Sequence, residues 1–195
     1  MLVRFSALLV AFLASLVALE AQQPDVAKVV IAAAMEQTKQ LVRYDGSYTR
    51  IPYPGGDVPA DRGVCTDVVI RAYRAAGIDL QKEVHEDMRR AFASYPKNWG
   101  LARPDTNIDH RRVPNLRTFF KRNGASIPVT RDPAAFLPGD LVTWNLTSGV
   151  PHIGIVVDRK SVDGIRHLVV HNIGAGPQLE DVLFAWTVTG HYRYP

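Results

Sequence analysis

The spacing of hydrophobic positions changes character after residue 140 of this chain. Before that point, apolar residues recur every three or four positions, as on one face of a helix, whereas later β-rich runs lie between turn residues. Helices first and strands second indicate an α+β fold in which helices pack on a small antiparallel sheet. The pattern predicts helices at residues 25–43, 64–76, 80–94 and 113–122, and strands at residues 141–146, 153–158, 168–173 and 182–188.

Residues with strong positional preferences mark the ends of the predicted helices. Asp25 is a good N-terminal cap for the first helix, and Gly77 is a typical residue after the C-terminal end of the second. Between these two helices, residues 44–63 are rich in glycine and proline and predict a long loop. No internal repeat, low-complexity tract or linker interrupts the pattern, so we expect one domain.

The start of the chain has its own pattern. A short basic segment precedes an apolar run of about 15 residues, which is typical of a signal peptide and short for a membrane span. We therefore expect a signal peptide at residues 1–21 and a mature domain at residues 22–195, with an uncleaved anchor as the alternative. Export predicts a location in the periplasm or outside the cell, in a bacterial envelope, with no stable membrane insertion after cleavage.

Composition limits the classes of partner. The chain has 195 residues, 47% of them hydrophobic, which is enough for one buried core. A net charge of +4 favours polyanionic partners, and for an exported protein these would be cell-wall polymers or anionic lipid. We expect no nucleic-acid partner, because no basic stripe with interleaved aromatic residues is present.

The chain contains one cysteine, Cys65, which cannot form an internal disulfide. It falls in the first turn of the second predicted helix, where the helix dipole and free N–H groups lower a thiol pKa and can hold an oxyanion. We expect a partly exposed thiol that acts as a nucleophile. The alternative is a cysteine that packs as a small buried hydrophobe.

A histidine at the start of a predicted strand is the candidate base. In the segment HIGIVVD, His152 shares one strand face with Gly154, while the larger apolar residues face the other way. Gly154 would leave room beside the imidazole for a helix terminus or a substrate backbone. We predict that His152 activates Cys65, with a structural histidine as the alternative.

A catalytic imidazole needs a polar group that fixes its tautomer, and His171 is the candidate for this role. A two-residue turn at Asp163-Gly164 would pair His171 with Val156, too far from His152 for a hydrogen bond. A wider loop would place His171 directly opposite His152. The sequence leaves both registers open, and Asn172 faces the other side of the sheet in either of them.

The remaining histidines suggest no metal site. They are not spaced as metal ligands, and the sequence contains neither an HExxH segment nor paired cysteines. We expect no metal and no cofactor.

The order of these features resembles the NlpC-type cell-wall cysteine peptidases, a papain-like superfamily. In that family a tyrosine and a Gly-Gly pair precede a helix-starting cysteine, and a Pro-Gly-Asp-Leu turn, a His-x-Gly-Ile strand and a polar strand end follow. The matching segments here are YPGGDVPADRGVC, LPGDLVTW, HIGIVVD and VVH, within residues 44–174. The resemblance implies a papain-like fold and a bacterial branch known mainly as a domain of unknown function.

The chain departs from that family around the cysteine. Where the family has Asp-Cys-Ser-Gly, residues 64–67 read Val-Cys-Thr-Asp, so the acidic residue follows the cysteine and the family's contacts there cannot be transferred. Thr66 and Asp67 are candidates for oxyanion or substrate contacts. Tyr48 or Tyr53 would take the part of the family tyrosine beside the oxyanion hole.

The resemblance implies hydrolysis of an amide bond in peptidoglycan, either in the stem peptide or between peptide and sugar. Cys65 would form an acyl-enzyme, His152 would transfer the proton and His171 would orient His152. The alternatives are an inactive cell-wall-binding module of the same fold and a thiol acyltransferase. A protein partner that restrains the enzyme is compatible with this function, and the sequence identifies none.

Overall fold

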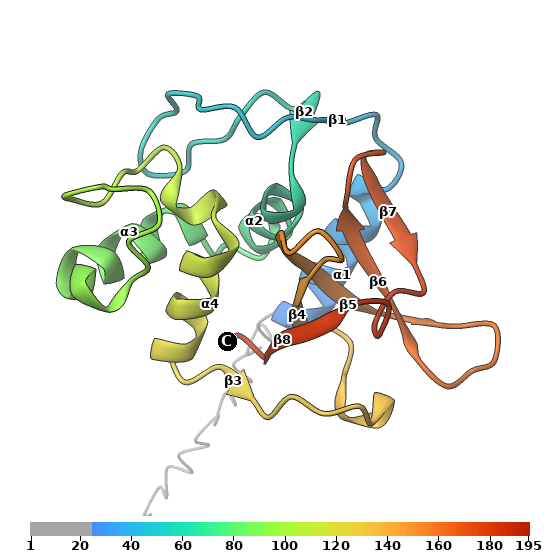
Figure 1. Ribbon diagram of the computed structural model, residues 1–195. Coiled ribbons are helices and arrows are strands. Elements are labelled where there is room, and N and C mark those ends of the chain that lie inside the picture. The colour runs from blue at the N-terminus through green and yellow to red at the C-terminus, as the bar shows by residue number, and fades with distance from the viewer. Residues whose placement is uncertain (1–24) are drawn as a thin grey trace, which may run out of the picture.

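The computed structural model describes residues 25–195, so the predicted signal peptide at 1–21 lies outside the described residues. Its helices precede most of its sheet in the chain, as Figure 1 shows. The α-helices are α1 (Val26–Gln37), α2 (Cys65–Ala75), α3 (Leu80–Ala91) and α4 (Val113–Arg122). The strands are β1 (Arg43–Tyr44), β2 (Arg62–Gly63), β3 (Ser126–Ile127), β4 (Leu141–Asn145), β5 (Pro151–Lys160), β6 (His167–Asn172), β7 (Pro177–Glu180) and β8 (Thr187–Tyr192).

Six of these strands form one sheet in the order β3-β8-β4-β5-β6-β7, and every neighbouring pair in it is antiparallel. The predicted α+β class, with helices on a small antiparallel sheet, is confirmed. Strands β1 and β2 form a separate short parallel pair at the two ends of the segment predicted as a loop, and Arg43 of β1 falls in what was predicted as the end of the first helix. This pair brings Tyr44 level with Gly63, just before α2.

The predicted strand at residues 182–188 is wrong. This segment is mostly a turn between β7 and β8, which lie on either side of it in the sequence. Its apolar residues suggested a strand because Leu183 is buried, but Leu183 covers the outer face of the sheet instead of pairing within it. Burial of a turn therefore produced the same pattern as burial of a strand.

The helix ends follow the local signals. Asp25 caps α1 by accepting a hydrogen bond from the backbone N–H of Ala27, and Gly77 adopts φ +81° after α2, as predicted. Helix α1 ends at Gln37, six residues before its predicted end. Among the described residues, no helix combines the length and apolar character that a membrane span requires.

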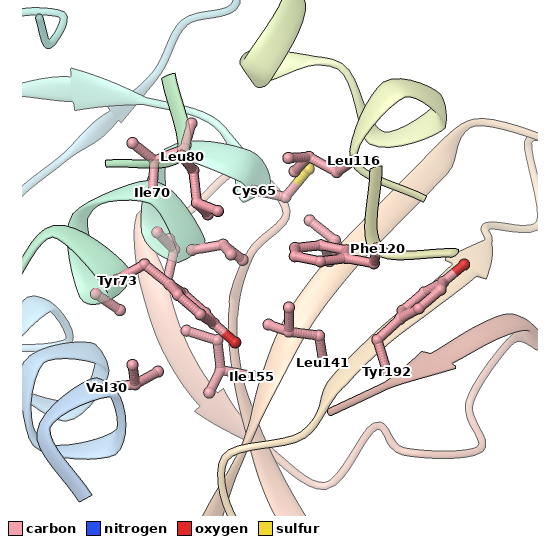
Figure 2. Close-up of a cluster of buried hydrophobic side chains, with 14 of the residues drawn as sticks. Val30, Cys65, Ile70, Tyr73, Leu80, Leu116, Phe120, Leu141, Ile155 and Tyr192 are labelled. Carbon is pink, nitrogen blue, oxygen red and sulfur yellow. The ribbon is translucent and has the colours of Figure 1, made fainter. Parts of the chain in front are cut away.

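Neighbouring residues of the central strands alternate between two hydrophobic clusters. Ile155 and Val170 pack in the larger cluster with α1, α2 and α4, whereas Val156 and Val169 pack in a smaller one with Phe136. Because successive side chains of a strand point to opposite faces, the two clusters cover opposite faces of the sheet. Figure 2 shows the larger cluster, with Cys65 at its edge.

Candidate active site

Cys65 is the first residue of α2, as predicted, and its position is fixed by the end of that helix. The preceding Val64 is extended, and its backbone N–H donates to the carboxylate of Asp67 at 2.6 Å. This contact satisfies one of the amides that a helix N-terminus leaves free. The side chain of Cys65 joins the larger hydrophobic cluster, and the residue is only 5% exposed. The expected partly exposed thiol is therefore a buried one.

Burial reverses the expected direction of the thiol pKa. The backbone N–H groups of Ile153, Thr66 and Cys65 itself lower the pKa, as a helix N-terminus should. Removal from water raises it further than these amides lower it, and the carboxylate of Asp67 adds to the rise, so the pKa reaches about 12. The prediction that position alone activates Cys65 is wrong for this state, in which the thiol is neutral.

Tyr44 is the tyrosine at the thiol, and the sequence analysis missed it. Burial, followed by the charges of Cys65 and Asp67, raises the pKa of Tyr44 to about 12, so its hydroxyl lies near the thiol. The β1–β2 pairing places Tyr44 beside Gly63, two residues before Cys65. The only sequence signal for this role was a tyrosine before the cysteine. The chain contains several tyrosines, so the signal did not single out Tyr44.

The two tyrosines that the resemblance suggested lie elsewhere. The hydroxyl of Tyr48 is 3.1 Å from the carboxylate of Asp105 and accepts a hydrogen bond from Asn107. The ring of Tyr53 packs against His85 with 5.0 Å between centroids. Both side chains thus have partners other than the thiol.

Thr66 and Asp67 are buried, and their side chains hold the N-terminus of α2 in place. The hydroxyl of Thr66 donates to the carbonyl of Arg111, and the guanidinium of Arg111 donates two bonds of 2.8 and 2.9 Å to Asp67. Arg111 also donates to the carbonyl of Ser47. These contacts join the loop before α2, the segment 100–112 and the nucleophile helix in one network. They occupy the polar groups that were candidates for substrate contacts.

His152 lies at the start of β5 on the sheet face that carries the smaller cluster. It is 1% exposed, and its ring lies 5.8 and 5.9 Å from the rings of Trp144 and Trp186. This apolar burial, with His171 as a smaller cause, lowers the pKa of His152 to about 3. The imidazole is therefore neutral at pH 7, as a general base must be before the reaction.

The structure brings His152 and His171 together. Nε2 of His152 lies 2.8 Å from Nδ1 of His171, and both residues are buried. Burial lowers the pKa of His171, although the carboxylate of Glu180 opposes this effect. Asn172 faces the other side, where its amide donates to the carbonyl of Gly63.

The register of β5 and β6 lies between the two that the sequence left open. Lys160 pairs with His167, as a two-residue turn requires, but a shift then pairs Ile155 with Val170. His171 thus lies opposite Gly154, diagonal to His152, which is a distance that two imidazoles can bridge.

Gly154 makes room for the neighbouring strand. A Cβ atom at this position would lie 2.6 Å from Val169 and 3.1 Å from the Cβ of His171. The expected open space for a helix terminus or substrate is thus filled by β6. The glycine allows His171 to approach its neighbour.

The carboxylate of Glu180 extends the series of polar side chains formed by His152 and His171. Oε2 of Glu180, on β7, lies 2.8 Å from Nε2 of His171. The oxygen lies outside the direction in which this nitrogen would hold its proton, so the contact has the length of a hydrogen bond without its alignment. Nothing in the sequence pattern pointed to Glu180.

These contacts favour one arrangement of protons. A carboxylate only accepts, so it favours a proton on Nε2 of His171, which leaves Nδ1 of that ring as an acceptor. Nε2 of His152 would then donate to it at 2.8 Å, and Nδ1 of His152 would be the free basic nitrogen. In this tautomer Nδ1 of His152 carries no proton, so it could accept one from Cys65.

The thiol and the imidazole approach from opposite faces at the same end of the sheet. The backbone N–H of Ile153, the residue after His152, lies close enough to the sulfur to lower the pKa of the thiol. Within residues 25–195, no hydrogen bond joins the sulfur to His152 itself. Pairing of the two groups would require the imidazole of His152 to turn toward the face of the sheet that carries Cys65.

Buried histidines make the folded state sensitive to acid. Burial lowers the pKa of His110 to about 3, as it does for His152, from an ordinary value of 6.5. Between these values the unfolded chain binds protons that the folded chain does not, so the free energy of unfolding falls as the pH falls. We expect a loss of about 2 kcal/mol per histidine between pH 7 and pH 4.5.

Urea denaturation at the two pH values measures this loss. The variant His110→Gln removes one of these titrating groups and should lose about 2 kcal/mol of the dependence on pH. Equal dependence in the variant and the wild type would show that His110 is not buried as a neutral ring.

Within the described residues, no group of three or more histidine, cysteine or acidic side chains is arranged to hold a metal ion. The polar groups around Cys65 instead form hydrogen bonds with one another and with the backbone.

Comparison with known proteins relates the chain to a family and to individual relatives. A family model described as "Domain of unknown function (DUF1287)" matches residues 31–194. The "Uncharacterized protein YijF" of Escherichia coli (strain K12) is 55% identical over 161 residues, which cover 83% of this chain and 78% of the relative.

One solved structure, "Structure of NlpC1 from Trichomonas vaginalis", is similar with 14% identity and a TM-score of 0.46. The match covers 90% of this chain and 46% of that chain, so this chain spans less than half the length of that structure.

Proposed function

Since this chain belongs to the DUF1287 family, a domain of unknown function, we propose a function from its own geometry: hydrolysis of an amide bond by the thiol of Cys65. The proposal rests on one observation, a series of polar side chains at one end of the sheet. Cys65 lies at the start of α2 beside Ile153, and the neighbouring His152 is bonded to His171 at 2.8 Å. A thiol, a neutral imidazole and an orienting group are the components that nucleophilic catalysis requires.

The reaction would begin from the neutral pair. The sulfur of Cys65 would attack the carbonyl carbon of the substrate while its proton passes to Nδ1 of His152. The backbone N–H of Cys65 at the start of α2 and the hydroxyl of Tyr44 would donate to the oxyanion that forms. His152 would then protonate the leaving amine, and the C–N bond would break to leave a thioester.

Water completes the cycle. His152 would take a proton from a water molecule, whose oxygen attacks the thioester carbon, and would return that proton to the sulfur as the C–S bond breaks. The products are an amine and a carboxylic acid. Neither oxidation nor reduction occurs, and the step uses only groups of this chain, substrate and water.

The substrate we propose is peptidoglycan, cleaved within its stem peptide or between peptide and sugar. The net charge of +4 favours a wall polymer that carries carboxylates. A groove of about 830 Å³ runs between Tyr48 and the segment 100–107, and Arg50 and Arg103 line it. Asp105 lines it too, but Tyr48 and Asn107 already occupy its carboxylate.

This groove is connected to the nucleophile helix. Arg111 donates to the carbonyl of Ser47, next to Tyr48, and to Asp67 in the first turn of α2. An acidic peptide in the groove would therefore lie along a loop that the buried Asp67–Arg111 ion pair holds against α2. We place the reaction in the cell envelope, in line with the apolar segment that begins the sequence.

A second candidate is a wall-binding module that performs no catalysis. One observation favours it: Cys65 is buried, and burial raises its pKa to about 12, as for a cysteine retained for packing. Alkylation by iodoacetamide between pH 6 and pH 10 separates the candidates. A binding module should give an unreactive thiol that replacement of His152 leaves unchanged, whereas the hydrolase should show a thiol whose reactivity depends on His152.

The test of the hydrolase is digestion of purified peptidoglycan, with products identified by mass spectrometry. New amine and carboxyl ends that require Cys65 would establish hydrolysis, and their masses would identify the bond. Products extended by an amine acceptor would instead establish a thiol acyltransferase. Binding of intact peptidoglycan without products from any fragment would support the binding module.

Tyr44→Phe is expected to lower kcat about tenfold, because it removes one oxyanion donor, and to leave folding intact, because the residue is 43% exposed and keeps its ring. Tyr48→Phe is the matched control, since its hydroxyl contacts Asp105 and Asn107. Steady-state kinetics on the same fragment compares the two. A larger loss in the Tyr48 variant would return the tyrosine role to the residue that the resemblance suggested.

A further inference from the structure

We propose that Glu180 is a positioning residue that fixes the tautomer of His171 and, through it, of His152. The inference rests on the proposed function for its effect on turnover. The arrangement that carries it is a line of three side chains from three neighbouring strands, His152 on β5, His171 on β6 and Glu180 on β7. The separations along this line are 2.8 Å between the two imidazoles and 2.8 Å between His171 and the carboxylate.

The pairing of β6 with β7 places the carboxylate of Glu180 beside the imidazole of His171. His171 pairs with Gln178 and Val169 pairs with Glu180, so Glu180 is the diagonal neighbour of His171 on the same face. The same diagonal relation connects His171 to His152 across β5. One line of side chains therefore crosses three strands from the solvent edge to the buried imidazole.

A carboxylate has an effect here that an amide would not have. It carries a negative charge and no proton to donate, so at 2.8 Å from Nε2 it favours a proton on Nε2 of His171 and leaves Nδ1 to accept from His152. A glutamine can present either its oxygen or its NH₂ group, and the latter would move the proton of His171 to Nδ1. Nδ1 of His171 could then no longer accept a hydrogen bond from Nε2 of His152. Nδ1 of His152 would no longer be kept free of a proton and available as the base.

The carboxylate also has an electrostatic effect. His171 is fully buried, and the ionisable groups that face it are His152 from β5 and Glu180 from β7, while Trp186 contributes an uncharged ring. When His152 accepts the proton of Cys65, its positive charge is stabilised through His171 by the negative charge of Glu180. The side chain of Glu180 is 45% exposed, so its carboxylate lies at the border between solvent and the buried imidazoles.

Nitrogen-15 NMR of the histidine side chains tests the tautomers directly. In the wild type we expect the rings of His152 and His171 to carry their protons on Nε2 at pH 7. In Glu180→Gln we expect a mixture of tautomers at His171. The matched control is Asp181→Asn, which removes one negative charge from the next residue, where the carboxylate contacts Arg166 on the surface. Its imidazole spectra should match those of the wild type.

Kinetics on the peptidoglycan fragment that the enzyme cleaves gives the second readout. Glu180→Gln should lower kcat on the order of tenfold with KM within about twofold, because the orienting contact acts after substrate binds. The carboxylate raises the pKa of His171. Its loss should therefore shift the acidic limb of the kcat/KM profile to lower pH. Asp181→Asn should change neither quantity.

The two readouts separate failure of this inference from failure of the proposed function. Unchanged tautomers in Glu180→Gln would overturn the positioning role whether or not the protein is a hydrolase. Mixed tautomers in a protein that cleaves no fragment would support the role of Glu180 and count against hydrolysis. Equal losses of activity in both variants, with an unshifted pH profile, would overturn the inference in favour of a general effect of surface charge.

Discussion

Cys65→Ala is expected to lower amide hydrolysis by a factor on the order of 10⁴ or more, because no other group in the site can form the acyl-enzyme. Among the described residues, the chain offers no second thiol. The rate of product formation from the cleaved peptidoglycan fragment measures the loss. Residual activity within tenfold of the wild type would remove the thiol from the mechanism.

The same variant also tests the burial of the thiol. A partly exposed cysteine would contribute almost nothing to stability, but Cys65 packs in the larger cluster with Leu116 and Val68. We therefore expect Cys65→Ala to lower the free energy of unfolding by about 1 kcal/mol. Urea denaturation provides the value, and Cys65→Ser, which has nearly the same volume, is the control for the cavity. A loss of several kcal/mol would favour a cysteine retained for packing.

His152→Ala should abolish turnover nearly as completely as loss of the thiol, by a factor on the order of 10³ to 10⁴, because His152 is the group that would take the proton of the thiol and return it to the leaving amine. Slow alkylation of Cys65 should remain. His167→Ala is the matched control, since it removes a histidine from the start of the neighbouring strand β6.

The variant must be shown to fold, because His152 packs against two tryptophan rings. His152→Gln keeps more of the side-chain volume and allows the same measurement if the alanine variant unfolds. Turnover within tenfold of the wild type in a folded His152 variant would transfer the role of base to another group. Turnover reduced equally in the His167 variant would point to a loss of strand pairing.

Much of the fold could be predicted because its signals are local. The cap at Asp25, the glycine after α2 and the position of Cys65 each depend on a few neighbouring residues. Alternation along β5 correctly separated His152 from the larger apolar side chains, which face the helices. The proximity of His152 and His171 was one of two registers that the sequence allowed, and the structure adopts a third that still joins them.

The remaining features depend on long-range packing. Tyr44 reaches the thiol through a parallel pair of two-residue strands, which is too short to leave a periodic pattern. Glu180 reaches His171 because of the pairing between β6 and β7. The pKa of Cys65 depends on how many apolar groups surround it, and these come from several helices and strands. None of these features can be predicted from the residues next to Tyr44, Glu180 or Cys65 in the sequence.

The register shift in β5 has a consequence for engineering. Between the pairs Val156–Val169 and Lys160–His167, β5 contains two more residues than β6, and they bring His171 about 7 Å nearer to His152 along the strand. The hairpin tip at residues 161–166 lies beyond this irregularity. An affinity tag or a longer loop inserted at the tip should leave the imidazole pair in place, whereas deletion of two residues from 157–159 would separate it. The hairpin thus offers a tolerant attachment point on one side of a segment whose length sets the spacing of the histidines.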